Sequence, residues 1–390
     1  MKKILIITTV GGFLPQFEMN DVKILMEQGY EIHYASNLEN PVYSLDREKL
    51  IGMGIRLHQI DICKSPVHIR HNIRAFRQLR AIMKQEGFSA VHCHNPMGGV
   101  LGRLAAGLGQ KSRRPYVIYT AHGFHFYKGA PLFNWIFYYP VEWLLARWTD
   151  CLITINREDT RRAESFLGRR LKSVRQIPGV GVDTERFAGN NIERQDVRGE
   201  LGLGENIFHI LSVGELNHNK NHEVILRALA LLRDPDICCG ICGKGYREQY
   251  LLGLAEELGL ENQVTFYGFR YDIPWMLQSA DCFCFPSIRE GLGIAALEAM
   301  AAGVPMITSD CRGTREYMEE GVTGYVCDSG SPEEYAALIK KMKENNGQRR
   351  TMSAVCRERA ENFDITRTDR IMREIYQRMD VQENEAAESA

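Results

Sequence analysis

Pro286-Ser-Ile-Arg-Glu-Gly-Leu-Gly-Ile-Ala-Ala-Leu-Glu-Ala-Met-Ala-Ala-Gly-Val-Pro305 is the stretch that decides how this chain folds. The glycines of Glu-Gly-Leu-Gly predict a turn, and residues 294–302 are an unbroken run of good helix formers that ends at Gly-Val-Pro. Glu290 and Glu298 therefore lie on either side of a helix start. The first N–H groups of a helix are unpaired and carry the positive end of its dipole, which suits a phosphate. If the intervening residues were helical, Glu298 would lie roughly 12 Å beyond Glu290, about the reach from a diphosphate to its ribose.

This pattern resembles the Glu-x7-Glu motif of the family 4 retaining glycosyltransferases, α/β enzymes with two facing Rossmann-like domains (GT-B) and a catalytic cleft between them. Residues 280–287 and 303–310 look like the strands that flank the motif in that family. The resemblance implies that Glu290 orients the transferred sugar, that Glu298 binds the ribose, and that Gly291, Leu292 and Gly293 bind the diphosphate of a nucleotide-sugar donor. The alternative is an ordinary βαβ unit, because the dipole alone favours an acid at a helix start.

Apolar runs alternate with amphipathic stretches along all 390 residues, which predicts parallel sheets with crossover helices. Strands are expected in two series: residues 4–8, 32–35, 90–93, 116–120 and 151–155, then 208–213, 237–242, 264–267, 281–285, 305–308 and 324–326. Between them lies the Gly- and Pro-containing segment 177–187, which suits a hinge and looks like the linker of the same transferases. We expect an N-terminal acceptor domain at 1–188, completed on analogy by a C-terminal helix at 364–380, a donor domain at 189–363 and a disordered tail at 381–390.

The net charge of −1 conceals an asymmetry. Residues 1–190 hold 26 basic and 16 acidic residues, whereas the remainder holds 22 basic and 33 acidic ones. A basic N-terminal half predicts an anionic partner, for which lipid head groups or a lipid diphosphate are as suitable as nucleic acid; the alternative is that the two halves attract each other. The eleven cysteines lie mostly in apolar runs, so we expect buried thiols and no disulfides. No segment approaches the length of a membrane-spanning helix.

Three further residues are candidates for the site. Lys220 matches the lysine that reaches the donor diphosphate in the family, although Glu215 stands where an arginine is usual. Gly12 follows the first strand, and the resemblance implies that it faces the diphosphate. His122 follows another strand, and the matching histidine of the family touches the sugar near the reacting carbon. The alternatives are a solvated lysine and a structural histidine.

No metal and no cofactor are expected. Asp234-Pro-Asp236 imitates a manganese motif, but its proline predicts a turn. His92 and His94 alternate along a strand, and we expect their rings on opposite faces, where they would not bind one ion.

Residues 67–84 place Arg70, Arg74 and Arg77 at helical spacing. A basic amphipathic helix can lie on an anionic membrane, and a surface helix of a Rossmann unit is the alternative. With the aromatic segment 133–143, this helix makes a lipid-linked acceptor plausible.

Residues 120–131 look like the branch of the family that builds bacterial capsular polysaccharide and exopolysaccharide on undecaprenyl diphosphate. We therefore expect a hexosyl- or N-acetylhexosaminyltransferase that uses a UDP-linked sugar and a lipid-linked glycan. It would act in the cytoplasm at the inner face of the cell membrane, without nucleic acid. The alternatives are a nucleotide-sugar epimerase and a non-catalytic subunit that binds a nucleotide sugar.

Overall fold

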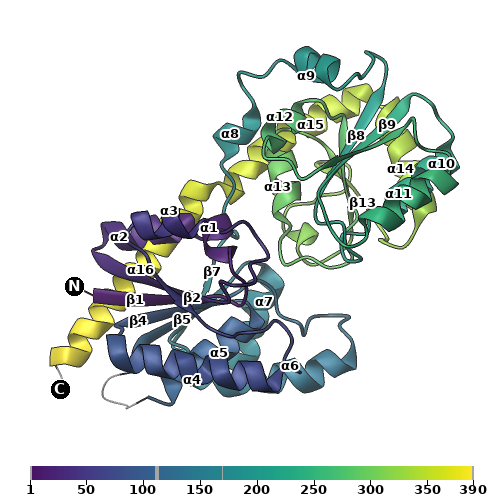
Figure 1. The fold of residues 1–390 in the computed structure, drawn as a ribbon. Helices are drawn as coiled ribbons and strands as arrows, with labels where there is room; N and C mark the ends of the chain where they lie inside the picture. The colour runs from purple at the N-terminus through teal and green to yellow at the C-terminus, as the bar shows by residue number, and fades with distance from the viewer. Residues whose placement is uncertain (1, 110–113, 169, 389–390) are drawn as a thin grey trace. The chain divides into compact units, whose positions relative to one another are not determined.

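The computed structural model describes residues 2–109, 114–168 and 170–388 and divides the chain into two compact units. The first unit contains Met1–Val180 and Thr366–Ala390, and the second contains Gly181–Ile365. Each has a parallel sheet with helices on its faces (Figure 1), as the alternation of apolar and amphipathic stretches predicts.

The first unit contains a seven-stranded sheet in the order β3-β2-β1-β4-β5-β6-β7, in which neighbouring strands pair in parallel. Its strands are β1 (Lys2–Ile7), β2 (Tyr30–Ser36), β3 (Arg56–Gln59), β4 (Ala90–His94), β5 (Tyr116–Ala121), β6 (Cys151–Thr154) and β7 (Ser173–Gln176). Its helices are α1 (Phe13–Phe17), α2 (Met19–Glu27), α3 (Arg47–Gly52), α4 (Ile69–Glu86), α5 (Pro96–Gly107), α6 (Leu132–Leu145), α7 (Arg157–Arg162) and α16 (Ile365–Glu388), with short helical segments at Ala146–Trp148 and Ala163–Leu167.

The second unit is a six-stranded sheet in the order β10-β9-β8-β11-β12-β13. Its strands are β8 (Phe208–Val213), β9 (Ile237–Cys242), β10 (Val264–Gly268), β11 (Cys282–Phe285), β12 (Met306–Ser309) and β13 (Gly324–Cys327). Its helices are α8 (Thr184–Ala188), α9 (Arg194–Glu200), α10 (Glu223–Leu232), α11 (Glu248–Glu257), α12 (Ile273–Gln278), α13 (Ile294–Ala301), α14 (Pro332–Glu344) and α15 (Asn346–Ala360), with short helical segments at Thr314–Glu316 and Glu361–Phe363.

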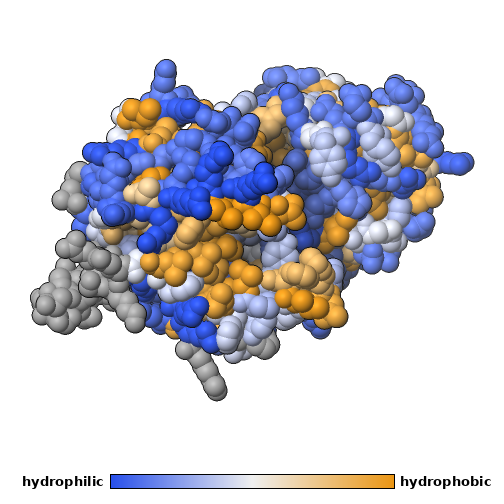
Figure 2. All heavy atoms as spheres, turned by 60° about the horizontal axis from the view of Figure 1, so that its bottom comes forward, coloured by the Kyte–Doolittle hydropathy of each residue, from blue (hydrophilic) through white to orange (hydrophobic). Residues whose placement is uncertain are grey.

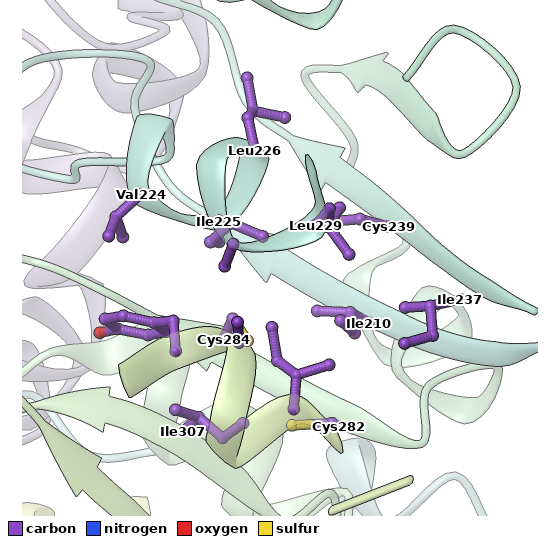
Figure 3. Packing of buried hydrophobic residues seen from close by; sticks show 14 of the residues in the cluster. Ile210, Val224, Ile225, Leu226, Leu229, Ile237, Cys239, Cys282, Cys284 and Ile307 are labelled. Carbon is purple, nitrogen blue, oxygen red and sulfur yellow. The ribbon is translucent and has the colours of Figure 1, made fainter. Parts of the chain in front are cut away.

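The core of the second unit explains its cysteines. Figure 3 shows Cys282 and Cys284 of β11 lying among the aliphatic side chains of neighbouring strands and of α10. Both side chains are fully buried, and all eleven cysteines of the chain are free thiols. The expectation that the cysteines pack as small hydrophobic residues is confirmed for nine of the eleven, whereas Cys63 and Cys238 are only partly buried.

The two segments that connect the second unit to the rest of the chain lie side by side. Thr184 Oγ1 donates to the carboxylate of Asp364 at 2.6 Å, and Val182 forms a parallel bridge with the same residue. Gly181 has a φ of 79°, and a Cβ there would lie 2.5 Å from the Cα of Ile365. Glycine is thus required at position 181, where the segment that enters the second unit approaches the segment that leaves it.

Two expected boundaries differ from the structure. The division between the units falls after Val180, eight residues before the expected end at 188, because the segment from Gly181 is bonded to Asp364 and Ile365. The last helix was expected to end at 380 and continues to Glu388. Residues 381–388 are rich in Glu, Ala and Gln, which are strong helix formers, and the disorder expected of the tail stays a prediction. Residues 389–390 lie outside the described residues.

Candidate functional site

The predicted helix start is present in the second unit. Helix α13 begins at Ile294, with Gly293 as its N-cap at a φ of 91°. A Cβ on Gly293 would also lie 2.7 Å from the Phe285 ring and 3.1 Å from the Tyr317 hydroxyl. Both the left-handed backbone and the close packing therefore require glycine here. Gly291 and Leu292 lie in the turn that precedes Gly293, at the expected diphosphate site.

Lys220 and Glu290 are brought together from positions 70 residues apart in the sequence. Lys220 Nζ donates to Glu290 Oε1 at 2.7 Å, and the ammonium lies 4.9 Å from the centre of the Phe285 ring. The side chains are 22% and 13% exposed, so both are within reach of a ligand. The structure thus brings together Glu290, which was expected to orient the sugar, and Lys220, which was expected to bind the diphosphate.

Backbone contacts hold the two loops of this pair together. The N–H of Ile288 donates to the carbonyl of Asn219 at 2.8 Å, and Asn219 Nδ2 donates to the carbonyl of Arg289 at 2.9 Å. The carboxamide of Asn217 accepts from the N–H of Lys220 at 2.9 Å. Lys220 and Glu290 are therefore positioned by fixed loops. Asn217 and Asn219 carried no motif that would have marked them as supports.

Arg312 is an arginine near this pair that the sequence reasoning missed. Its Nε donates to the backbone carbonyl of Glu290 at 3.4 Å, and the side chain is buried. A Cβ on the next residue, Gly313, would lie 2.9 Å from Leu292, so this loop packs directly against the turn. Arg312 thus places a positive charge beside the Glu290 loop, in a chain that has Glu215 where the family usually has arginine.

Glu298 lies in the second turn of α13 and is partly buried. Burial raises the pKa of its carboxyl to about 7, and the positive charge of Arg186 in α8 opposes that rise. A carboxyl with such a pKa loses its proton near neutrality, or when a ligand donates hydrogen bonds to it. That property suits a group that accepts hydrogen bonds from two ribose hydroxyls.

In the first unit, Gly12 lies at the N-terminus of α1 with a φ of 84°. There is no room for a side chain at this position, because a Cβ on Gly12 would lie 2.3 Å from the carbonyl oxygen of Tyr43. The carbonyl of Gly11 also accepts from the N–H groups of Val42 and Tyr43. The glycines thus permit a close approach between this loop and residues 42–44, and a role for Gly12 toward the diphosphate stays a prediction.

His122 belongs to a buried polar cluster that the sequence did not predict. Its Nε2 lies 3.3 Å from Nδ1 of His94 and 3.7 Å from Oε1 of Glu18, and the ring of Phe13 packs edge-on against it at 5.2 Å. Behind them, the hydroxyl of Tyr376 in α16 donates to Asp21 at 2.8 Å. Glu18 and Asp21 were not among the predicted site residues, and only the fold brings them to His122.

Burial controls the protonation of this cluster. It lowers the pKa of both His94 and His122 to about 4, so both imidazoles are neutral at pH 7. It raises the pKa values of Glu18 and Asp21, and the repulsion between the two carboxyls raises that of Asp21 further. The lining of a small cavity of about 10 Å³ includes Glu18, Asp21 and His122, enough room for about one water molecule. A neutral His122 beside carboxyls whose pKa values are raised can form hydrogen bonds with sugar hydroxyls.

The structure corrects one argument about metal ions. His92 and His94 were expected on opposite faces of a strand, but their ring centres are 4.1 Å apart, because residues two apart on a strand share a face. Among the described residues, Glu18, His94 and His122 place one ligand atom each within 4.8 Å of one another, so they are close enough to hold a cation. Asp234 and Asp236 form a turn, as predicted, and both carboxylates contact Lys343.

Arg70, Arg74 and Arg77 lie on α4 with exposed side chains, as the helical spacing predicts. Arg74 also pairs with Asp61 at 3.0 Å, so it is only partly available to another anion. Within the described residues, no helix is long and apolar enough to cross a membrane.

Two family models match this chain, one in each half. Residues 3–156 match "Glycosyl transferase 4-like" and residues 193–361 match "Glycosyl transferases group 1". The putative glycosyltransferase EpsD of Bacillus subtilis is 39% identical over 96% of both chains. The UDP-Gal:alpha-D-GlcNAc-diphosphoundecaprenol alpha-1,3-galactosyltransferase of Escherichia coli is 27% identical over 81% of both.

Anabaena Alr3699/HepE, solved in complex with UDP and glucose, has a similar fold, with a TM-score of 0.75 and 19% identity over 97% of this chain and 100% of its own. At that identity the likeness concerns the fold alone, and the fold is that of a GT-B glycosyltransferase. With matches in both halves and a relative similar over almost its whole length, this chain belongs to the group 1, family 4-like glycosyltransferases.

Proposed function

We propose that this protein transfers a hexosyl or N-acetylhexosaminyl group, with retention of configuration, from a UDP-linked sugar to a lipid-linked glycan. The proposal rests chiefly on the Lys220–Glu290 pair, which the loops before α10 and α13 hold at 2.7 Å beside the Gly293 helix start. A cation, a carboxylate and helix N–H groups at one place are what binding of a sugar diphosphate requires.

In the proposed reaction, each side chain has a separate task. Lys220 and the α13 N-terminus bind the diphosphate and stabilise the negative charge that grows on it as the bond to the sugar breaks. Glu290 orients the sugar through its hydroxyls, and Glu298 accepts hydrogen bonds from the ribose. On the first unit, Gly12 faces the diphosphate and His122 contacts the sugar. The acceptor oxygen attacks the face that the diphosphate leaves, so no residue of the protein becomes covalently attached.

The acceptor in this proposal is a glycan on undecaprenyl diphosphate, in the synthesis of bacterial exopolysaccharide or capsule. The E. coli relative's name includes an acceptor of that kind, and EpsD is the relative similar over nearly the whole chain. Such an acceptor lies at the inner face of the cell membrane. We therefore propose that the protein acts there peripherally, with Arg70, Arg74 and Arg77 toward anionic lipid.

A donor screen tests the proposed function. UDP-hexoses and UDP-N-acetylhexosamines are incubated with a soluble analogue of a diphosphate-linked acceptor, and NMR of the product identifies the new linkage. Acceptor-dependent transfer with an unchanged anomeric configuration is expected. Release of a free sugar or an epimer without acceptor would instead support an epimerase, and an inverted linkage would overturn retention.

We expect EDTA to leave this transfer largely intact, because Lys220 and helix N–H groups neutralise the diphosphate without a metal ion. The assay is run after dialysis against EDTA. Complete loss that manganese restores would reassign Asp234 and Asp236. Loss that only zinc restores would make Glu18, His94 and His122 a metal site.

Glu298→Gln is expected to weaken UDP binding roughly tenfold, because hydrogen bonds from the ribose to an ionised carboxylate are lost. The effect should depend on pH. The free enzyme holds a proton on Glu298 up to a pKa of about 7, so wild type gains affinity as pH rises from 6 to 8, whereas the Gln variant lacks that gain. For the same reason this carboxyl's contribution to folding stability falls as pH rises from 4.5 toward 7.

The measurement is the ratio of the two UDP dissociation constants at each pH, from which the titration of UDP itself cancels. The ratio should widen between pH 6 and 8. Equal binding of UDP by both proteins would show that Glu298 does not hold the ribose.

Replacing Arg70, Arg74 and Arg77 together by Gln should weaken binding to anionic vesicles and spare transfer to a water-soluble acceptor. Vesicle sedimentation at rising salt measures this, because exposed charges interact less as the Debye length falls to about 8 Å. Equal binding of wild type and the triple variant would leave α4 as an ordinary surface helix.

A further inference from the structure

Helix α6 is apolar on its outward face as well as on the face that packs into the unit. The face turned into the unit carries Trp135, Tyr138, Tyr139 and the helix's single charged residue, Glu142. The opposite face is exposed and wholly apolar, consisting of Leu132, Phe133, Ile136, Phe137, Pro140, Val141 and Leu144. A surface helix of a soluble protein usually presents polar and charged residues to water.

The inward face is anchored by a buried ion pair. Glu142 Oε1 accepts from Arg103 of α5 at 3.0 Å, and the second carboxylate oxygen lies 2.8 Å from the same guanidinium. Arg103 also donates to the carbonyl of Gly99 at 2.8 Å. The Arg103 guanidinium stacks on the Tyr119 ring at 3.9 Å, and its side chain is 1% exposed. A buried charge held by a partner is costly to move. The orientation of α6, with its apolar residues outward, is therefore built into the core of the unit.

The outward residues form a large hydrophobic surface. Leu132, Phe133, Ile136 and Phe137 are between 55% and 74% exposed. Figure 2 brings the side of the first unit that carries α4 and α6 forward and shows hydrophobic side chains gathered over a broad area beside hydrophilic ones. Exposed apolar surfaces of this kind mark sites that bind a protein partner or a membrane.

The surroundings of the patch favour a membrane. Lys128 before α6 and Arg147 after it are exposed, and Arg170 stacks on the half-exposed Trp143 at 3.3 Å. On α4, which like α6 packs against α5, Ile69 and Ile73 are exposed beside the three arginines named above. Apolar side chains with tryptophan and basic residues around them match the acyl region and anionic head groups of a bilayer. A symmetric dimer through this patch would bring its like charges together.

We propose that the outward face of α6 inserts into the acyl-chain region of an anionic membrane and holds the first unit at the bilayer surface. The 14 residues of α6 extend about 21 Å, too short to span the apolar core, so the helix lies in the plane of the interface. This inference rests on the proposed membrane location. It adds a hydrophobic contact made by α6 to the electrostatic contact made by the arginines of α4, and only the electrostatic contact is weakened by salt.

The test compares Ile136→Gln/Phe137→Gln with a control, Leu231→Gln/Tyr271→Gln, which changes exposed apolar residues of the second unit. Both are assayed as the full chain on vesicles of phosphatidylglycerol and phosphatidylcholine, at low salt and at about 0.5 M salt, where attraction between exposed charges is largely screened. The α6 variant should bind at least about tenfold more weakly at high salt, because two inserted side chains are lost. The control should bind like wild type.

Depth is measured by quenching of tryptophan fluorescence with lipids brominated on the acyl chain. Wild type should be quenched, and Trp143→Phe should lose most of that quenching. The proposal is overturned if high-salt binding is equal in wild type and the α6 variant, or if wild type is not quenched. It is also overturned if sedimentation shows a dimer that the α6 substitutions dissociate. Transfer to a water-soluble acceptor, measured in parallel, reports on the proposed activity independently of vesicle binding.

Discussion

Lys220→Ala is expected to lower kcat by roughly 30- to 1000-fold, about 2–4 kcal/mol, while the donor KM changes far less. In the proposed reaction Lys220 neutralises the negative charge that grows on the departing diphosphate, so its contribution would be larger in the transition state than in the bound donor. In the free protein the ammonium is paired with Glu290 at 2.7 Å. Lys220→Arg keeps the charge and should retain more activity than the alanine variant.

Lys343→Ala is the matched control, because Lys343 also pairs with a carboxylate of the second unit, Asp234, at 2.6 Å. Thermal unfolding of both variants separates the loss of an ion pair from the loss of catalysis. The two should unfold at similar temperatures, and only Lys220→Ala should lose turnover. Unchanged kcat in Lys220→Ala would remove this residue from the mechanism.

Glu290→Gln is expected to lower kcat by roughly 100-fold, with a smaller effect on the binding of free UDP, since the proposed role of the carboxylate is to contact the reacting sugar and not the nucleotide. Glu223→Gln is the control, because Glu223 pairs with Arg247 at 2.8 Å in the same unit. Measured UDP affinity that falls as much as kcat would contradict the assignment to the sugar.

The double variant Lys220→Ala/Glu290→Gln then tests whether the pair acts together. Residues in direct contact are usually not additive, so the double variant should lose less activity than the product of the two single losses. Full additivity would mean that the 2.7 Å contact of the free protein has no role in the reaction.

Most strands could be predicted because they are central and buried on both faces. Strands β8 and β9 have the predicted bounds, β11 begins one residue later than predicted, and β12 is shifted by one residue at both ends. The strands missed were β3 and β7, the two edges of the first sheet. Their residues are partly exposed and polar, so they have no apolar run to mark them.

The site of the second unit was visible in the sequence because glycines, a helix start and two acids occur within a few residues. The cluster around His122 was not visible, since its other members come from three separate elements: α2 and its N-cap (Asp21 and Glu18), β4 (His94) and α16 (Tyr376). Their proximity depends on how α2 and α16 pack beside β4 and β5. The expectation that His92 and His94 lie on opposite faces was wrong for another reason. Residues two apart on a strand share a face, so the sequence already implied that the two rings are neighbours.

The role of Lys220 toward a diphosphate came from the resemblance to the family and stays a prediction. The sequence by itself determined the alternating α/β pattern and the start of α13 between its two acids. These depend on local preferences and on spacing along one element. Only the tertiary structure decided that Lys220 meets Glu290, that burial moves the pKa values of Glu18, Asp21 and Glu298 upward, and that α6 turns its single charge inward. Those outcomes depend on which distant residues exclude water from one another, and spacing along a single chain does not specify that.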